Sequence, residues 1–419
     1  MKTIVLSFNL VSVKQISTFL ALFLFLGACQ SPGPGTGDET VVVVSFDGFR
    51  WDYPDLYSTP NFDRMADNGV KAERLIASFP TKTFPNHYTL VTGLYPDHHG
   101  LIANTFHEPV RDVVYRIRDR QKVQDAWFYG GEPIWVTAEK QGVISASYYW
   151  VGSSAPIGGI HPTYYKVYDQ SVSFDDRIDT VLQWLTLPEN RRPRLVTLYF
   201  HEPDAVGHQY GPESQETGRV IREMDRLLGE LRRGIGSLPH SDRVNLIVLS
   251  DHGMGAIHPD RYVNIYEYAD SAYILDQLGG SPGLLLDIKD GWEDSVAAWL
   301  DPVEGIAAWT GERIPPELHY GTHERFPDVL VLADSSWSVG TVDNLSGYTG
   351  GAHGYDSRNT DMHAIFYAEG PAFRENSAHP PFENVQVYGI IAYILGLEPA
   401  PTDGDISAVE DLFAAPIAE

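Results

Sequence analysis

The chain has 419 residues, of which 43% are apolar and 12% aromatic, with 38 Gly and 28 Pro. This composition indicates a folded, loop-rich protein and excludes a coiled coil, a collagen-like chain and a disordered chain. The formal net charge of −26 argues against a protein that coats nucleic acid polymers or binds anionic membranes through basic patches.

The amino-terminal segment has the pattern of an export signal. Two lysines and no acid accompany an apolar run from Ile16 to Leu26, which small residues separate from the single cysteine, Cys29. The stretch Leu26-Gly27-Ala28-Cys29 resembles a bacterial lipobox, in which the cysteine becomes the lipidated first residue of the mature protein. We therefore expect a lipoprotein-type signal peptide at residues 1–28.

Lipid on Cys29 would then be the only membrane contact, in the periplasm or at the cell surface of a bacterium. Residues 29–39 are rich in Gly and Pro and suit a flexible tether. An ordinary cleaved signal with an accidental cysteine is one alternative. An uncleaved transmembrane anchor is another, disfavoured because the apolar run is shorter than the roughly 20 residues that span a bilayer.

The single cysteine also limits the metal chemistry of the chain. Neither an internal disulfide nor a thiolate metal cage can form. Any bound metal must therefore be held by Asp, Glu and His.

From Thr40 onward the chain has no repeat and no second linker, so we expect one domain over residues 40–415. Short β-branched runs predict buried parallel strands, and helical patterns lie between them. This alternation predicts an α/β fold with a doubly wound, mainly parallel sheet flanked by helices. The predicted strands are Val41–Phe46, Arg194–Phe200, Val244–Ser250 and Asp328–Ala333, and the predicted helices include Pro60–Asn68 and Glu213–Arg233.

Acidic residues follow three of these strands. Asp47 comes directly after the first strand, Asp251-His252 after the Val244 strand, and Asp204 four residues after Phe200. Because ligands bind beyond the carboxyl ends of parallel strands, these side chains are candidates for a site. His208 lies four residues after Asp204, on the same face if that turn is helical. Each element alone has an ordinary alternative, a turn or a surface ion pair.

His353 is a further candidate ligand. It lies in Gly350-Gly351-Ala352-His353-Gly354, where glycines let the backbone approach a crowded centre. Three carboxylates and three imidazoles then converge, and this mixed set suits two zinc ions and is compatible with other first-row divalent ions. The histidines that lack such a partner pattern are His98 and His99, in a predicted loop, and His258, His319 and His363.

Thr83 is the candidate nucleophile. It stands at the expected start of a helix within residues 79–93, where free backbone N–H groups and the helix dipole favour an anion. A threonine hydroxyl coordinated to a divalent cation becomes an alkoxide at neutral pH. Taken alone, Thr83 would be a helix cap.

Seven short motifs occur along the chain from about Thr40 to the region of Phe373. They are SFDGFR at 45–50, FPTKTFPNH at 79–87, GLYP at 93–96, GEPIW at 131–135, EPD at 202–204, SDHGM at 250–254 and GAHGYD at 351–356. Together they resemble the nucleotide pyrophosphatase/phosphodiesterase family, within the alkaline phosphatase superfamily.

This resemblance implies an alkaline-phosphatase-like fold and a phosphodiesterase with two zinc ions. The implied ligands are Asp47, Thr83, Asp251 and His252 for one ion, and Asp204, His208 and His353 for the other. Thr83 would attack a phosphodiester in line to give a phosphothreonine, which water then hydrolyses. Asn104 matches the family residue that donates to a nonbridging phosphate oxygen, its alternative being an ordinary loop asparagine.

The resemblance also implies a nucleotide pocket. Family members that cleave nucleotides clamp the base between aromatic residues, and stacking tolerates any base. The residues at the matching places are Phe84, Trp150, Tyr168 and Tyr199, with Lys82 beside the nucleophile. Ser154 stands where some nucleotide-cleaving relatives carry an acid.

The leading hypothesis is a monomeric hydrolase that releases nucleoside monophosphates from nucleoside triphosphates, dinucleotides or nucleotide sugars. A phosphodiesterase for choline-type phospholipid headgroups is the enzymatic alternative, and it would require acids among the aromatic residues to accept a cation. A noncatalytic, metal-bound surface binding protein is an alternative of another class. Thr83 and the complete set of ligands argue against it.

Overall fold

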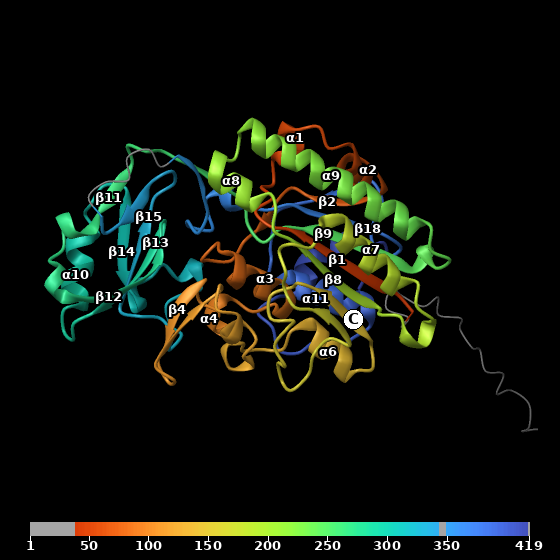
Figure 1. The fold of residues 1–419 in the computed structure, drawn as a ribbon, viewed down its shortest axis with the longest axis horizontal. Helices are drawn as coiled ribbons and strands as arrows, with labels where there is room; N and C mark the ends of the chain where they lie inside the picture. The colour runs from red at the N-terminus through yellow and green to blue at the C-terminus, as the bar shows by residue number, and fades with distance from the viewer. Residues whose placement is uncertain (1–37, 343–348, 418–419) are drawn as a thin grey trace, which may run out of the picture.

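The computed structural model describes residues 38–342 and 349–417, so the signal peptide, Cys29 and nearly all of the tether lie outside the described residues. An eight-stranded sheet forms the larger part of the molecule, and a separate four-stranded sheet lies at the left end of the view in Figure 1. Within the described residues, no helix has the length and apolar character needed to cross a membrane.

The large sheet is mainly parallel, as predicted. Strands β9, β1, β8, β6 and β7 run parallel to one another, and β18 is antiparallel to both of its neighbours. In spatial order the strands are β19 (Ser377–His379), β2 (Gly69–Ala72), β18 (Phe366–Glu369), β9 (Val244–Leu249), β1 (Thr40–Phe46), β8 (Leu195–Phe200), β6 (Ser145–Tyr148) and β7 (Tyr164–Lys166).

Helices cover both faces of this sheet, which explains why the central strands are apolar at successive positions. Along β1, Val41 and Val43 join one buried cluster, and Val42 and Val44 join the other. On one face pack α2 (Pro60–Asn68), α7 (Phe174–Leu185) and α9 (Gln215–Gly236), and on the other α3 (Thr83–Thr92), α6 (Ile134–Lys140) and α11 (Gln386–Leu395) (Figure 1). The doubly wound arrangement is thereby confirmed.

The four-stranded sheet corrects one sequence prediction. Its strands are β12 (Ile274–Gly280), β13 (Gly283–Ile288), β15 (Val329–Ala333) and β14 (Ile306–Thr310), all antiparallel. The predicted parallel strand Asp328–Ala333 is β15. Val329 and Val331 pack into a cluster with α10 (Glu293–Leu300), whereas Leu330 and Leu332 join the large core. Because both faces are buried, β15 has the apolar run that is typical of a parallel strand.

Short elements complete the fold. The predicted helices Pro60–Asn68 and Glu213–Arg233 are α2 and α9, and the predicted loop at His98 and His99 instead forms the short helix α4 (Pro96–His99). The other short helices are α1 (Tyr53–Leu56), α5 (Arg120–Val123) and α8 (Asp204–Tyr210). The two-stranded pairs are β10 (Gly255–Ile257) with β17 (Gly350–Ala352), β11 (Tyr262–Asn264) with β16 (Ser338–Gly340), β3 (Leu75–Ile76) with β20 (Phe382–Glu383), and β4 (Thr105–Glu108) with β5 (Val113–Arg116).

Candidate metal centre and active site

The fold brings the ends of three neighbouring strands to one edge of the sheet. Asp47 follows β1 directly, Asp251 follows β9 after one residue, and Asp204 begins α8 just beyond β8. The pairing of β10 with β17 carries His353 to the same place. The glycines before it permit the close approach, since a Cβ at Gly350 would lie 2.1 Å from the carbonyl oxygen of His208.

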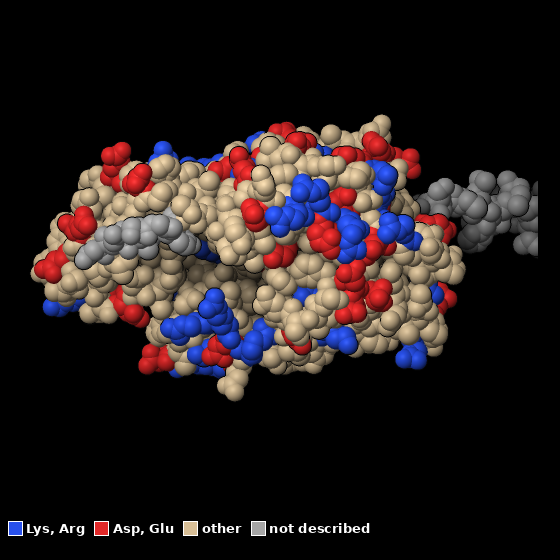
Figure 2. Space-filling view, turned by 45° about the horizontal axis from the view of Figure 1, so that its top comes forward, with Lys and Arg blue, Asp and Glu red and all other residues tan. Residues whose placement is uncertain are grey.

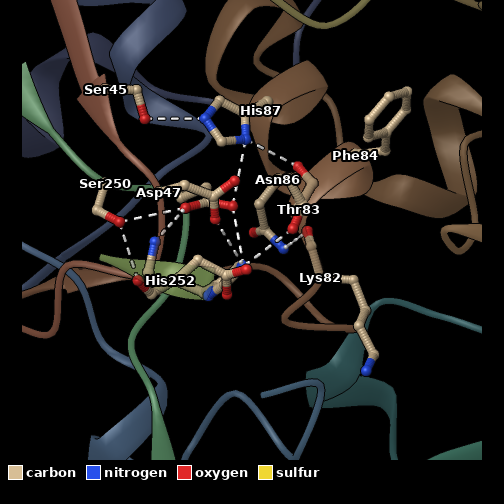
Figure 3. A network of polar contacts seen from close by, with 12 residues as sticks. Ser45, Asp47, Lys82, Thr83, Phe84, Asn86, His87, Ser250 and His252 are labelled. Carbon is tan, nitrogen blue, oxygen red and sulfur yellow. Dashed lines mark hydrogen bonds and ion pairs between the residues drawn. The ribbon is translucent and has the colours of Figure 1, made fainter. Parts of the chain in front are cut away.

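One group of side chains surrounds Nε2 of His252 (Figure 3). This nitrogen lies 3.0 Å from Oδ2 of Asp251 and 3.5 Å from Oδ1 of Asp47. The hydroxyl oxygen of Thr83, at the first position of α3, lies 3.3 Å from it. Both carboxylates and the imidazole are buried, while Thr83 is partly exposed.

A second group surrounds Oδ1 of Asp204. Nε2 of His208, one helical turn later in α8, and Nε2 of His353 each lie 3.4 Å from this oxygen. The two groups are adjacent, because the rings of His252 and His353 stack with their centroids 3.6 Å apart. The structure thus brings all seven sequence-predicted ligand residues together. His252 lies between the two groups, because Asp204, His252 and His353 together also form a group that could hold a metal ion.

The three imidazoles share one hydrogen-bonding pattern. Nδ1 of His208 donates to the carbonyl of Gly351, Nδ1 of His252 to that of Gly253, and Nδ1 of His353 to that of Thr81. In the neutral imidazole, Nε2 is then the unprotonated nitrogen, and it faces the carboxylates with a lone pair. A backbone carbonyl that fixes the tautomer in this way is typical of histidines that ligate a metal.

The carboxylates also fit cations. Oδ1 of Asp47, Oδ1 of Asp204 and Oδ2 of Asp251 are buried and accept no hydrogen bond. Burial, and then the charges of Asp251 and Asp204, raise the pKa of Asp47 well above its ordinary value. Burial and the neighbouring His252 hold the pKa of His353 well below its usual range, so its imidazole is in the neutral form that binds metals. Unsatisfied oxygens that face neutral imidazoles fit divalent cations with nitrogen and oxygen preference, such as zinc.

His87 is a site residue that the sequence argument missed. Its buried Nδ1 lies 2.9 Å from the carbonyl oxygen of Thr83 and 3.2 Å from Oδ2 of Asp251, and Ser45 lies 2.8 Å from its Nε2. His87, Asp47 and Asp251 also form a group that could hold a metal ion. The signal was available in the sequence, because a residue four positions after Thr83 lies on the same face of α3.

An aromatic pocket opens beside Thr83. Its volume is about 390 Å³, and Phe84, Trp150, Tyr168 and Tyr199 all line it, as expected. Tyr199 has a second role, since its hydroxyl donates a 2.6 Å hydrogen bond to Oδ2 of Asp47. Trp150 is only 2% exposed and donates from Nε1 to the carbonyl of His87, so little of its ring is available to a ligand.

Basic side chains that the sequence argument did not name also line this pocket. Arg118, Arg120 and Lys166 are among its lining residues, and Arg120 lies over the ring of Tyr168 at 5.7 Å. In the face of the molecule drawn in Figure 2, Lys and Arg side chains gather along the lower edge of a hollow. Of the described residues that line the pocket, the only acids are Asp47 and Asp204. The pocket therefore favours an anionic ligand that carries an aromatic group.

The side chain of Asn104 lies beside Thr83, whereas that of Lys82 points toward the His353 segment. Oδ1 of Asn104 accepts a hydrogen bond from the backbone N–H of Phe84, which places this side chain at the start of α3 beside Thr83. Lys82, expected as a substrate-binding residue beside the nucleophile, does not line the aromatic pocket. Its Nζ donates to the carbonyl of His353 at 2.7 Å, and the side chain points away from Phe84 in Figure 3. Burial lowers the pKa of Lys82 to about 8.

Thr81 connects the nucleophile segment to the His353 segment. Besides accepting from Nδ1 of His353 through its carbonyl, Thr81 uses its hydroxyl oxygen to donate to the carbonyl of Tyr355 and to accept from the N–H of Gly354. The buried Thr81 therefore fixes the two segments relative to each other.

The α/β fold and the two groups of possible metal ligands are typical of metal-dependent phosphoesterases. Comparison with known proteins identifies the family within this class. The family described as type I phosphodiesterase / nucleotide pyrophosphatase matches residues 41–356, so the chain belongs to this family. Its relatives include a venom phosphodiesterase of Crotalus durissus collilineatus, which is 36% identical over 93% of this chain and 48% of the relative.

Other relatives extend the comparison to a mammalian protein and to solved structures. Ectonucleotide pyrophosphatase/phosphodiesterase family member 3 of Bos taurus is 34% identical over 90% of this chain and 44% of its own length. The chain thus spans about half the length of the curated relatives it matches. The structure of an inactive variant of murine ectonucleotide pyrophosphatase/phosphodiesterase 5 in complex with AMP matches with a TM-score of 0.85 and 35% identity, over 90% of this chain and 100% of that one. This match confirms the predicted fold.

Proposed function

We propose that this chain is a two-zinc phosphodiesterase that cleaves nucleotide phosphodiester or pyrophosphate bonds and releases nucleoside monophosphates. One observation carries the proposal: the hydroxyl of Thr83 stands between a ligand set suited to cations and a pocket lined by aromatic and basic side chains. A nucleotide has the matching parts, a phosphate next to a flat base.

The proposed zinc ligands follow the two groups. One ion would be held by Asp47, Thr83, Asp251 and His252. The other would be held by Asp204, His208 and His353. When bound, zinc supplies Lewis-acid chemistry, which acidifies nearby hydroxyl groups and offsets the charge that develops on a phosphoryl group. His87 contacts both Asp251 and the carbonyl of Thr83, and so holds this ligand and the first turn of α3 in position.

Thr83 is the proposed nucleophile. Its Oγ1 attacks the phosphorus of the bound ester in line, the bond to the leaving oxygen breaks, and a phosphothreonine results. Water then hydrolyses this ester, so two displacements give net retention at phosphorus. Asn104, fixed by the N–H of Phe84, is placed to donate from its amide to a nonbridging phosphate oxygen.

The pocket residues have distinct proposed roles. Phe84 and Tyr168 stack on the base, while Arg118, Arg120 and Lys166 attract the anionic substrate to a protein that is acidic overall. Tyr199 contacts the base and orients Asp47. The AMP complex of the murine relative supports a nucleotide as the ligand here.

A choline-type phospholipid headgroup is less well supported. A quaternary ammonium group needs carboxylates among the aromatic side chains. The two acids in the described pocket lining are both proposed zinc ligands. A noncatalytic binding protein would not need Thr83 directed at Nε2 of His252.

A substrate panel under one zinc concentration tests the proposal. We expect the p-nitrophenyl ester of thymidine monophosphate to give the highest kcat/KM. Bis-p-nitrophenyl phosphate should follow, and p-nitrophenyl phosphate should be poor. The highest rate with p-nitrophenylphosphocholine would replace the nucleotide proposal by the headgroup alternative.

We also propose that lipid on Cys29 tethers the mature chain, as a monomer, in the periplasm or at the cell surface of a bacterium. The lipobox-like stretch that ends at Cys29 supports this. Cys29→Ser should move the protein from membrane to soluble fractions without loss of specific activity. A variant that stays with the membrane would contradict the proposal.

A further inference from the structure

Three cations in the wall of the aromatic pocket have no acidic partner among the described residues. Arg118 and Lys166 are exposed and Arg120 is half-buried, and none of them forms a salt bridge with a described carboxylate. This is unexpected in a chain where 56 Asp and Glu accompany 30 Lys and Arg. A general attraction for anions does not explain it, because cations anywhere near the pocket would provide that attraction.

The acids that neighbour these cations in the sequence are engaged elsewhere. Asp119 caps the start of α5, where its carboxylate accepts from the backbone N–H groups of Gln121 and Lys122. Asp169 accepts from both the backbone N–H and the hydroxyl of Ser171. The positive charge of the pocket wall is therefore not balanced by a local ion pair within the described residues.

A series of contacts places the cations on the side of the pocket away from the proposed zinc ligands. The hydroxyl of Tyr199 bonds Asp47, and the Tyr199 ring lies 6.2 Å from the ring of Tyr168. The guanidinium of Arg120 in turn lies over the Tyr168 ring at 5.7 Å. Lys166 ends β7, the third strand from β1, so a strand spacing of about 4.8 Å separates its backbone from β1 by roughly 14 Å. A nucleoside on the aromatic wall would have the zinc ligands on one side and the cations on the other.

The chemistry of this wall selects among the groups that a nucleoside can present. A neutral base edge offers both donors and acceptors, whereas Arg and Lys side chains only donate. The two acids in the described lining are both proposed zinc ligands, so neither is left to offset the three cations. A phosphate monoester carries about −1.5 to −2 charge at neutral pH, and an arginine can bind it through two parallel hydrogen bonds. The wall therefore fits a phosphate better than the edge of a base.

We propose that Arg118, Arg120 and Lys166 form a subsite for a second phosphate, carried by the ribose of the substrate. The inference rests on the proposed function, because the scissile phosphate must lie at Thr83 while the nucleoside occupies the aromatic pocket. The favoured substrates are nucleotides whose ribose carries a 2′- or 3′-phosphate besides the phosphate that is attacked. The subsite binds this group and leaves it intact, so the released product is a nucleoside bisphosphate.

Two matched pairs of compounds test the subsite. Coenzyme A and dephospho-coenzyme A have the same scissile bond and the same leaving group, and they differ only in the 3′-phosphate. NADP and NAD differ only in the 2′-phosphate. Because hydrogen bonds between charged groups are strong, we expect wild type to cleave the phosphorylated member of at least one pair with a kcat/KM about 10-fold or more above that of its partner. The pair that shows this preference identifies the ribose oxygen that carries the phosphate.

Variants of the exposed cations connect the preference to the subsite. Arg118→Gln and Lys166→Gln each remove one charge from the pocket wall. Each should lower the preference, which is the ratio of the two kcat/KM values within a pair, by at least about 5-fold, mainly through a higher KM for the phosphorylated compound. Arg116→Gln is the matched control, because Arg116 is also exposed, lies two residues before Arg118 and does not line the pocket. Its preference should remain that of wild type.

Two results would overturn the subsite. The first is a wild-type enzyme that prefers neither phosphorylated compound. The second is an equal change of preference in Arg116→Gln and Arg118→Gln, which would show that only the overall field of the cations acts. Failure of wild type to cleave any of the four compounds would instead count against the proposed function.

Discussion

The hydroxyl of Tyr199 donates a 2.6 Å hydrogen bond to Oδ2 of Asp47, so one aromatic side chain belongs both to the pocket and to the metal centre. Tyr199→Phe keeps the ring and removes the bond. Because groups that orient metal ligands typically contribute 10- to 100-fold, we expect kcat/KM to fall at least about 10-fold. The loss should be equal for thymidine monophosphate p-nitrophenyl ester and for bis-p-nitrophenyl phosphate. A loss confined to the nucleotide ester would mean that the hydroxyl contacts only the substrate.

Tyr168 and Phe84 should behave in the opposite way. Both line the pocket, where the ring of Phe84 packs against Tyr115 and that of Tyr168 against Tyr149 and Tyr199. Replacing either by Ala removes about 1 to 3 kcal/mol of stacking, or roughly 5- to 150-fold in kcat/KM for the nucleotide ester. Bis-p-nitrophenyl phosphate, which has no base, should change by less than about 3-fold. Equal losses on both substrates would indicate that the rings only pack the domain.

Thr83→Ala should abolish turnover while it leaves the fold and most of the bound zinc in place. The hydroxyl is the proposed nucleophile, but it is only one of four proposed ligands to its ion. Steady-state rates, together with zinc per chain from elemental analysis, measure the two effects separately. Thr83→Ser serves as the control because it keeps a hydroxyl. Activity of Thr83→Ala above a tenth of wild type would contradict the assigned role.

Asp204→Ala and His353→Ala should each reduce zinc from two ions toward one per chain. Oδ1 of Asp204 is the atom that His208 and His353 share, so its removal leaves two imidazoles without an anionic partner. Because a bound metal favours the folded state, the free energy of unfolding should also fall in the presence of zinc. Variants that still bind two zinc ions would show that the ligands are assigned wrongly.

His99 should make the stability depend on pH. It is fully buried, and burial lowers its pKa from 6.5 to about 3. Below pH 6.5 the unfolded chain binds a proton that the folded chain does not. Stability is therefore fully present above pH 6.5 and decreases as the pH falls toward 3, by about 2 kcal/mol at pH 5.

Urea unfolding at pH 7.5 and pH 5 measures this dependence. His99→Gln should be less stable than wild type at pH 7.5, because it disturbs the hydrogen bonds with Thr89 and Leu101, but its stability should fall less between the two pH values. His258→Gln replaces an exposed imidazole and should show the same decrease as wild type. An unchanged decrease in His99→Gln would refute the assignment.

Strand ends made much of the site predictable from the sequence. Asp47, Asp204 and Asp251 follow apolar runs, and neighbouring parallel strands must end at a common edge, so their convergence follows from the order of the runs. The β15 strand was misplaced because burial on both faces gives an apolar run in either kind of sheet. The direction of the Lys82 side chain could not be predicted from the sequence either. Its Nζ donates to the carbonyl of His353, which is distant in the sequence. His87 was missed although it lies one helical turn after Thr83 in α3, because its partners Ser45 and Asp251 are distant in the sequence.

The hydrogen bond between the carbonyl of Thr81 and Nδ1 of His353 joins residues 272 positions apart. A ribosome must therefore make most of the chain before the segment that carries Thr83 meets the ligand that completes the second group. Until then the second proposed ligand group lacks one of its three residues, so the proposed metal centre can be completed only late in synthesis.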